Sequence, residues 1–498
     1  MTRSAGLVAA LLLCVFALAP LGYPGYIQPQ AGFRPVYWFY AWERGGLDAT
    51  WAPPDGDGLL PYALAEGFRL LGMSGPDALK AVFGLSVLLT ALGAYLLLSR
   101  SLSPPAALGL ALVWTYAPMS LAAVYARGLP GAALALGLLP WLALAPRWAS
   151  APGQFLGGRR GAAIALAALA ALSSPGFAVV GLLTLLLVRI PAEESPRRHW
   201  FATALALVAT CLLVLVVRPP TRAPFLQFAL PYQLLSSRVG YGASSLPWAV
   251  EAPAPLSLGV LPLAIALGGL LFPHSPRSRR WLPFLLALVF LVALALPIAE
   301  PVWTRMGLST LLAGPWQLLA IACFLLTWLA AELIGPRLAA QPSLAVALGL
   351  LALILAVPAL DPPLTPLQPA ARPLASFDGG RILLLGAELH GPLRHGATLR
   401  LRLYWQAREP LPRDYTVFVH VLDAGGRKWG QRDSWPGAGQ LPTSGWRPGR
   451  VVVDDHAVYV DLDGPRQGYR LVIGLYDLET GERLPLGTGG TELELVGG

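Results

Sequence analysis

The sequence predicts an α-helical polytopic membrane domain followed by an all-β sandwich domain. The composition is 55% hydrophobic and only 13% charged, and the mean hydropathy is +0.58. Long apolar runs recur up to about residue 360, each near the roughly 20 residues that cross about 30 Å of hydrocarbon. Beyond Arg381 the hydrophobic period changes to two. We therefore expect a transmembrane domain at 1–361, a linker at 362–378 and an extracytoplasmic β-sandwich at 379–498.

The charge is distributed unevenly along the chain. Residues before 370 hold 12 of the 27 acids and 21 of the 36 basic residues, so the net charge of +9 belongs to the apolar part. Arginines that flank membrane spans explain this basic balance, and no nucleic-acid partner is expected. The three cysteines all fall in apolar runs, which excludes a disulfide framework and a CxxC metal site.

About eleven transmembrane helices are expected. The first run, 5–21, contains Ala17-Leu18-Ala19, which is similar to a signal cleavage site, but Pro20 disfavours cleavage and favours an uncleaved span. A stretch at 161–190 is broken at Ser173-Ser174-Pro175-Gly176 and predicts two short spans. The remaining spans are expected near 77–99, 104–125, 129–146, 200–217, 255–272, 281–298, 311–334 and 341–360.

Orientation follows from the arginines, which gather in the loops that share a side with the N-terminus. With that side cytoplasmic, eleven crossings place the tail outside the membrane. Only two lysines occur among many alanines, leucines and glycines, which is typical of a GC-rich bacterial gene. The expected location is the bacterial cytoplasmic membrane.

The tail shows the alternation of half-buried strands. Leu399, Leu401 and Leu403 alternate with polar or aromatic residues, and the segment 417–421 repeats the pattern. Seven or eight short strands in under 130 residues are typical of a β-sandwich. Its tryptophans are interpreted either as sugar-stacking platforms or, more commonly, as turn-packing residues: Trp429, Trp435 and Trp446.

Acids in the predicted outer loops are the first candidates for chemistry. Asp55 and Asp57 lie one residue apart in a Pro- and Gly-rich turn, where two carboxylates can bind a divalent metal ion. The alternative is a turn whose aspartates cap their own backbone. Glu43 and Glu251 are further outer-loop acids.

One part of the chain, about 20–190, resembles bacterial 6-pyruvoyl-tetrahydropterin synthase-related multispanning membrane proteins, which are similar to the GT-C glycosyltransferases. The resemblance rests on the turn Trp51–Pro53 and on Leu70–Ser74, Ala78–Lys80, Ala123–Gly128 and Leu138–Pro140. It implies transfer of sugars from polyprenyl-phosphate donors at the outer face, with an acid of the first outer loop as base or metal ligand. The tail is similar to the β-sandwich that follows such regions, through 403–406, 415–420, Asp433, 442–446, Asp454 and 474–477.

Within the resembling segment, Asp55 or Asp57, and less so Glu43, is the implied base or metal ligand, and Tyr125 and Arg127 are the implied substrate-binding residues. Glu251 lies beyond that segment and is a further substrate-binding candidate, as an acid of the second outer loop. A guanidinium such as that of Arg127 suits bidentate binding of a lipid phosphate. The alternative for Arg127 is an interfacial arginine that snorkels to the membrane surface.

The sequence departs from this family at three places. Gln30–Pro35 replaces an Asp followed by a His-containing helix, Ala132 stands where an acid is expected, and Ser173 or Ser174 replaces a histidine. Two hypotheses remain open. The chain is either a glycosyltransferase acting on membrane lipid-linked sugar and an envelope glycan or glycoprotein acceptor, or a non-catalytic anchor or assembly partner that displays a glycan- or protein-binding sandwich. A transporter is less attractive because few ionisable residues are intramembrane, Glu332 being the main one.

Overall fold

A computed structural model describes most of residues 2–27, 57–149, 158–189, 256–306, 314–365, 373–437 and 441–496, with gaps at 272–280, 361, 363, 391, 447 and 450 and a few further residues at 35–39, 228–235 and 308–312. Two compact units result: a helical unit that ends at Leu367 and a β unit that begins at Gln368. The described residues Val36, Trp38 and Phe39 belong to the β unit. Each unit is considered by itself.

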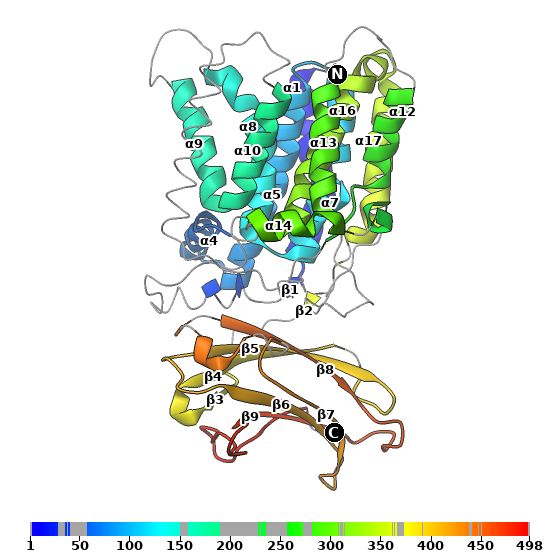
Figure 1. The fold of residues 1–498 in the computed structure, drawn as a ribbon. Coiled ribbons are helices and arrows are strands. Elements are labelled where there is room, and N and C mark those ends of the chain that lie inside the picture. Colours follow the sequence, from blue (N-terminus) through cyan, green and yellow to red (C-terminus); the bar gives the residue numbers. More distant parts are fainter. Residues whose placement is uncertain are drawn as a thin grey trace. The chain divides into compact units, whose positions relative to one another are not determined.

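The helical unit is a bundle whose long helices run side by side (Figure 1). Its elements are α1 (Arg3–Leu13), α2 (Val15–Leu18), η1 (Ala19–Gly22), α4 (Leu60–Leu70), α5 (Gly75–Leu98), α6 (Pro104–Thr115), α7 (Pro118–Ala122), the π-helical turn η3 (Ala123–Arg127), α8 (Pro130–Ala149), α9 (Gly158–Ser173), α10 (Pro175–Arg189), α12 (Val260–Leu271), α13 (Leu282–Ala295), η6 (Pro297–Ala299), α14 (Glu300–Met306), α16 (Trp316–Ala340), α17 (Pro342–Ala356) and η7 (Val357–Ala359).

Four stretches of the described chain are long and apolar enough to cross a membrane: Arg3–Gly22, Gly75–Leu98, Trp316–Ala340 and Pro342–Ala359. Two bent pairs, α6 with α7 and η3 at 47° and α13 with η6 and α14 at 80°, raise the number to six. Each bend falls where a proline opens the second helix, since proline cannot continue the hydrogen-bond ladder. Apolar helices confirm a membrane protein, whereas the count of eleven is not confirmed, and the span expected at 200–217 lies outside the described residues.

A short antiparallel pair links the ends of the first and last spans. β1 (Tyr26–Ile27) pairs with β2 (Leu364–Thr365), so both spans end at the same side of the bundle. Lys80 of α5 fastens this region, because its Nζ donates to the carbonyls of Tyr23 at 2.9 Å and Gly25 at 3.0 Å. Figure 1 shows α4, α7, α14 and β1 at this end, opposite the N-terminus.

The predicted interruption of the 161–190 stretch is confirmed. α9 ends at Ser173 and α10 begins at Pro175, so the two helices form a hairpin. A proline at the first helical position suits a helix start, because its missing N–H would have no intrahelical partner there. The break lies at the end of the bundle where the candidate site is found.

The β unit is a sandwich. Its strands are β3 (Ala375–Phe377), β4 (Ile382–His390), β5 (Thr398–Ala407), β6 (Tyr415–Leu422), β7 (Lys428–Ser434), β8 (Val451–Tyr459), β9 (Arg470–Asp477) and β10 (Leu493–Val496). They form two antiparallel sheets, β10-β9-β6-β7 and β3-β4-β5-β8 (Figure 1). Alternate residues of β5, β6 and β9 fill one core between the sheets. Because β3 pairs with β4, the sandwich begins inside the predicted linker 362–378.

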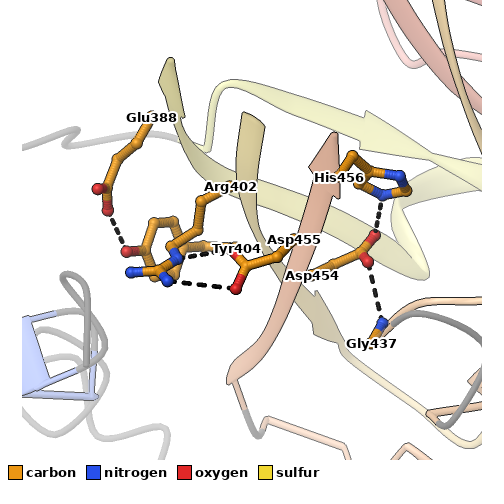
Figure 2. Close-up of polar contacts among 7 residues, drawn as sticks. All are labelled: Glu388, Arg402, Tyr404, Gly437, Asp454, Asp455 and His456. Carbon is orange, nitrogen blue, oxygen red and sulfur yellow. Dashed lines mark hydrogen bonds and ion pairs between the residues drawn. The ribbon is translucent and has the colours of Figure 1, made fainter. Parts of the chain in front are cut away.

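The opposite face of β5 is closed by polar side chains. Arg402 is 5% exposed and donates to Asp455 through Nε at 2.7 Å and Nη2 at 3.2 Å, and Tyr404 hydrogen-bonds Glu388 (Figure 2). Burial disfavours the charge of Arg402, but Asp455, Tyr404 and Glu388 together outweigh burial and raise the arginine pKa. The sheet therefore buries charge on one face and hydrocarbon on the other.

The three tail tryptophans differ in their surroundings. Trp446 lies in the core and donates from Nε1 to the carbonyl of Leu441, while the ring of Trp429 is covered by the Arg427 guanidinium at 4.3 Å. Only Trp435 of the three is exposed, at 37%. Turn packing therefore explains Trp429 and Trp446.

Candidate functional site

The junction between η3 and α8 lies at the centre of the candidate site. Arg127 is the last residue of the π-helical turn, and Gly128 follows it with a left-handed φ of 63°, which a glycine adopts without steric cost. Pro130 then opens α8. Such π-helical turns occur frequently at functional sites, and this one turns Arg127 into the bundle.

Asp57 reaches the amino end of α8 from a distant part of the sequence. Its Oδ1 accepts the backbone N–H of Ala132, the third residue of α8, at 3.1 Å, and its Oδ2 accepts the hydroxyl of Tyr62 at 3.2 Å. The carboxylate is fully buried. It satisfies an N–H that the helix itself leaves without a partner, and its negative charge complements the helix dipole. Asp57 thus caps α8 rather than its own turn.

Three segments close tightly around this carboxylate. The N–H of Gly58 donates to the carbonyl of Ser173 at 2.5 Å, which brings the start of α4 to the break between α9 and α10. A Cβ added at Gly131 would stand 2.2 Å from the Ser173 oxygen and 2.5 Å from Oδ1 of Asp57. Glycine is therefore required at position 131 by the approach of these two oxygens.

Two positions singled out in the sequence contact the Asp57–Gly58 segment through their backbones. They are Ala132, where an acid was expected, and Ser173, which with Ser174 stands where a histidine was expected. The third, Gln30–Pro35, lies largely outside the described residues. Sequence reasoning missed Tyr62 and Gly131, because neither belongs to a recognisable motif.

Arg127 is a buried cation, and one hydrogen-bonding edge of its side chain has no partner among the described residues. Its side chain is 6% exposed, and its Cζ lies 4.9 Å from the ring centroid of Trp316. Nε and Nη2 have no hydrogen-bond partner in the part of the chain that the structure describes. An ionised group that is removed from water without a partner is costly, so such a group indicates a binding role.

Two other arginines show what this edge binds. Arg402 uses Nε and Nη2 for the carboxylate of Asp455, and Arg69 uses the same two atoms for Glu66 at 2.8 and 2.6 Å. The edge formed by Nε and Nη2 is a fork that matches two oxygens of one oxyanion. Arg127 offers this fork inside an apolar bundle, where hydrogen bonds are strengthened by the low dielectric.

Tyr125 packs between η3 and the first span, and its expected substrate-binding role stays a prediction. Its side chain is fully buried, and its hydroxyl donates to the carbonyl of Ala17. The contact fastens η3 to the first span. Arg127, two residues later, is thereby held at a fixed depth in the bundle.

The other expected site residues, Glu43, Asp55 and Glu251, lie outside the described residues, so their roles stay predictions. The described residues contain no group of three or more His, Cys, Asp or Glu side chains that can hold a metal ion. Asp55, the expected second metal ligand, lies outside these residues, so the metal site at Asp55 and Asp57 stays a prediction. The described groups offer a carboxylate that can take a proton and a guanidinium that can bind an oxyanion.

No protein-family model matches the chain, and neither does any curated protein. Among solved structures, the chain is similar to the arabinofuranosyltransferase AftD from mycobacteria, with 15% identity and a TM-score of 0.42 over 72% of this chain and 26% of AftD. The chain thus spans about a quarter of AftD. A second similarity, to the alkylpurine DNA glycosylase AlkC from Pseudomonas fluorescens, has 11% identity and a TM-score of 0.15 over 97% of this chain and 98% of AlkC. TM-scores this low do not establish a shared fold.

Proposed function

We propose that the protein is a GT-C-like membrane glycosyltransferase that uses polyprenyl-phosphate-linked sugars at the outer face of the bacterial cytoplasmic membrane. The observation that supports this most is the hydrogen bond of the buried Asp57 carboxylate to Ala132, five residues after Arg127 in the sequence. The helical unit thus holds a buried carboxylate at the start of α8 and, at the end of η3, a guanidinium whose Nε and Nη2 have no partner among the described residues. These are the two groups that transfer from a lipid phosphate requires.

In the proposed reaction, an acceptor hydroxyl attacks the anomeric carbon of the donor sugar. The bond between that carbon and the phosphate oxygen breaks, and polyprenyl phosphate leaves with the bonding electrons. Arg127 binds the phosphate oxygens through Nε and Nη2 and stabilises the charge that develops on them. Asp57 takes the hydroxyl proton through Oδ2, the oxygen that accepts from Tyr62, while Oδ1 stays on the amino end of α8.

The membrane arrangement belongs to the same proposal. The N-terminus is cytoplasmic, the sandwich is extracytoplasmic, and the acceptor is an envelope glycan or glycoprotein. The positive-inside distribution of arginines supports the orientation. Exposed Trp435 is the residue of the sandwich best suited to stack on an acceptor sugar.

The test is sugar transfer by the full chain in liposomes, supplied with a panel of polyprenyl-phosphate hexoses and pentoses. Release of free sugar to water serves as the readout, so the acceptor need not be known. Asp57→Asn is expected to lower the rate roughly a hundredfold or more, as loss of a general base does. Asp77→Asn is the control, because Asp77 is another aspartate of the helical unit, lies in the first turn of α5 and has an exposed side chain. Full activity in Asp57→Asn would show the assignment to be wrong.

One observation favours the non-catalytic anchor. Both oxygens of Asp57 are engaged and no part of the residue is exposed, which is how a purely structural helix cap is built. In that case the wild-type chain turns over no donor in the panel. The full chain then binds envelope glycans, and Trp435→Ala lowers that binding while Asp57→Asn leaves it unchanged.

A further inference from the structure

The aromatic ring beside the Arg127 guanidinium comes from a helix far along the sequence. Trp316 is the first residue of α16, a 25-residue helix, and is 4% exposed. Its ring lies 4.9 Å from Cζ of Arg127. The separation is within the roughly 6 Å over which an aromatic ring attracts a cation. The two residues are brought together only by packing of α16 against the segment that contains η3.

The amino end of α16 adds a second positive element. A helix N-terminus bears a partial positive charge from its aligned peptide dipoles, so a guanidinium beside it is disfavoured unless an anion is present. Gln317 and Leu318 direct their N–H groups to the carbonyls of Gly314 and Pro315, at 3.2 and 3.0 Å. The first turn is therefore ordered, and the helix begins at the tryptophan that contacts Arg127.

We infer that Trp316 is the positioning residue of an oxyanion site at Arg127, and that this site takes the phosphate ester of a membrane lipid. The inference deepens the proposed function and rests on it for the sugar attached to that phosphate. The indole ring holds the guanidinium plane, which leaves the Nε and Nη2 edge free to bind two oxygens. A fixed plane reduces the ordering cost that binding would otherwise incur.

The surroundings favour a lipid ester over free phosphate. Arg127 is the last residue of an apolar segment that forms a bent candidate span with α6. Its neighbours Ala123, Val124 and Ala126 are all buried. A phosphate that carries a hydrocarbon chain can remain in this environment, whereas inorganic phosphate must give up its hydration without an apolar group to offset the loss.

The test is calorimetric titration of the full chain in detergent with geranyl phosphate. Geraniol and inorganic phosphate are the comparison probes. Trp316→Leu is expected to weaken geranyl phosphate binding about fivefold, within the range of cation–π contributions, and to leave geraniol binding unchanged. Trp316→Phe keeps a ring and is expected to remain within about twofold of wild type.

A double-mutant cycle separates positioning from packing. Arg127→Met is expected to abolish the preference for geranyl phosphate over geraniol. Adding Trp316→Leu to Arg127→Met should then cause no further loss of geranyl phosphate affinity. Trp328→Leu is the matched control, because Trp328 is also buried in α16 but packs on Phe284 and Phe324. It should lower thermal stability and keep the preference for geranyl phosphate.

Three results would overturn the inference. They are equal weakening of geraniol and geranyl phosphate by Trp316→Leu, a further loss in the Arg127→Met background, or inorganic phosphate binding as tightly as geranyl phosphate. Asp57→Asn separates this inference from the proposed function, because it should abolish sugar transfer and leave geranyl phosphate affinity unchanged. If Trp316 and Arg127 are coupled in geranyl phosphate binding but the wild-type chain transfers no sugar, only the proposed glycosyltransferase function is wrong.

Discussion

Two buried arginines, Arg402 in the sandwich and Arg127 in the bundle, are exposed to almost the same extent but have opposite surroundings. Arg402 donates from Nε and Nη2 to the carboxylate of Asp455. Arg127 has the same two atoms without a partner among the described residues and rests on Trp316. A buried cation with its own carboxylate holds the fold together. A buried cation without one indicates a site for an anion from outside the chain.

Arg69 provides a third environment for the same geometry. Its Nε and Nη2 bind Glu66 within α4, but the arginine side chain is 37% exposed. Water screens this pair, so the geometry alone contributes little. Comparing the three arginines separates the effect of burial from the effect of the partner.

The largest expected effect is at the partner of Arg402. Asp455→Ala leaves a buried guanidinium without its carboxylate and should lower the stability of the sandwich by about 3–5 kcal/mol. Hydrogen exchange of β5 and β8 in the full chain under increasing denaturant measures this loss. Asp463→Ala, in an exposed turn, is the control. A loss of stability below about 1 kcal/mol would show that the buried charge of Arg402 does not depend on Asp455, and Arg402 would then not be an example of a buried cation held by its own carboxylate.

A smaller effect is expected at Asp57, the carboxylate that caps α8. Asp57→Ala removes the cap of α8 and should cost about 1–2 kcal/mol, read as faster hydrogen exchange in the first turn of α8. Asp57→Asn keeps an oxygen for the Ala132 N–H and should cost about half as much. If Asp57→Asn were as destabilising as Asp57→Ala, charge rather than capping would be what the site requires.

Of the ion pairs compared, the partly exposed pair Arg69–Glu66 should contribute least to the free energy of unfolding. Glu66→Gln is expected to change stability by at most about 0.5 kcal/mol at neutral pH. The hydrogen bond from Arg69 lowers the pKa of Glu66. The stabilisation by the Arg69–Glu66 pair is therefore fully present above the ordinary glutamate pKa of about 4.3. It is lost as the pH falls through the lowered pKa that Glu66 has in the folded protein. Denaturation of both proteins at neutral and acidic pH should show the difference vanish in acid.

Arg127→Met should change stability by about zero or raise it slightly, since it replaces an unpaired buried charge by an apolar side chain of similar length. The same substitution in the sandwich, Arg402→Met, strands Asp455 and should be strongly destabilising. Thermal unfolding of the two variants in one detergent provides the measurement. A loss above about 1 kcal/mol in Arg127→Met would mean that Arg127 is structural, and the anion site would be rejected.

Much of the fold could be predicted from local pattern. The break at Ser173–Pro175 and the alternation of Leu399, Leu401 and Leu403 are both found in the structure. The strand β3, which lies within the predicted linker, could not be predicted, because three residues are too short to show a period. The candidate site was predicted in part. Asp57 and Arg127 were identified as residues, but Tyr62, Gly131 and Trp316 were not.

The sequence by itself indicated whether lipid or water surrounds each part of the chain. Apolar runs of about 20 residues indicate lipid, an alternation with period two indicates strands of a soluble sheet, and both patterns can be recognised from neighbouring residues alone. Only the tertiary structure decided that Asp57 caps α8 and that Trp316 lies on Arg127. Both contacts join segments that are far apart in the sequence. They depend on how side chains interlock when helices pack, and no local pattern records that.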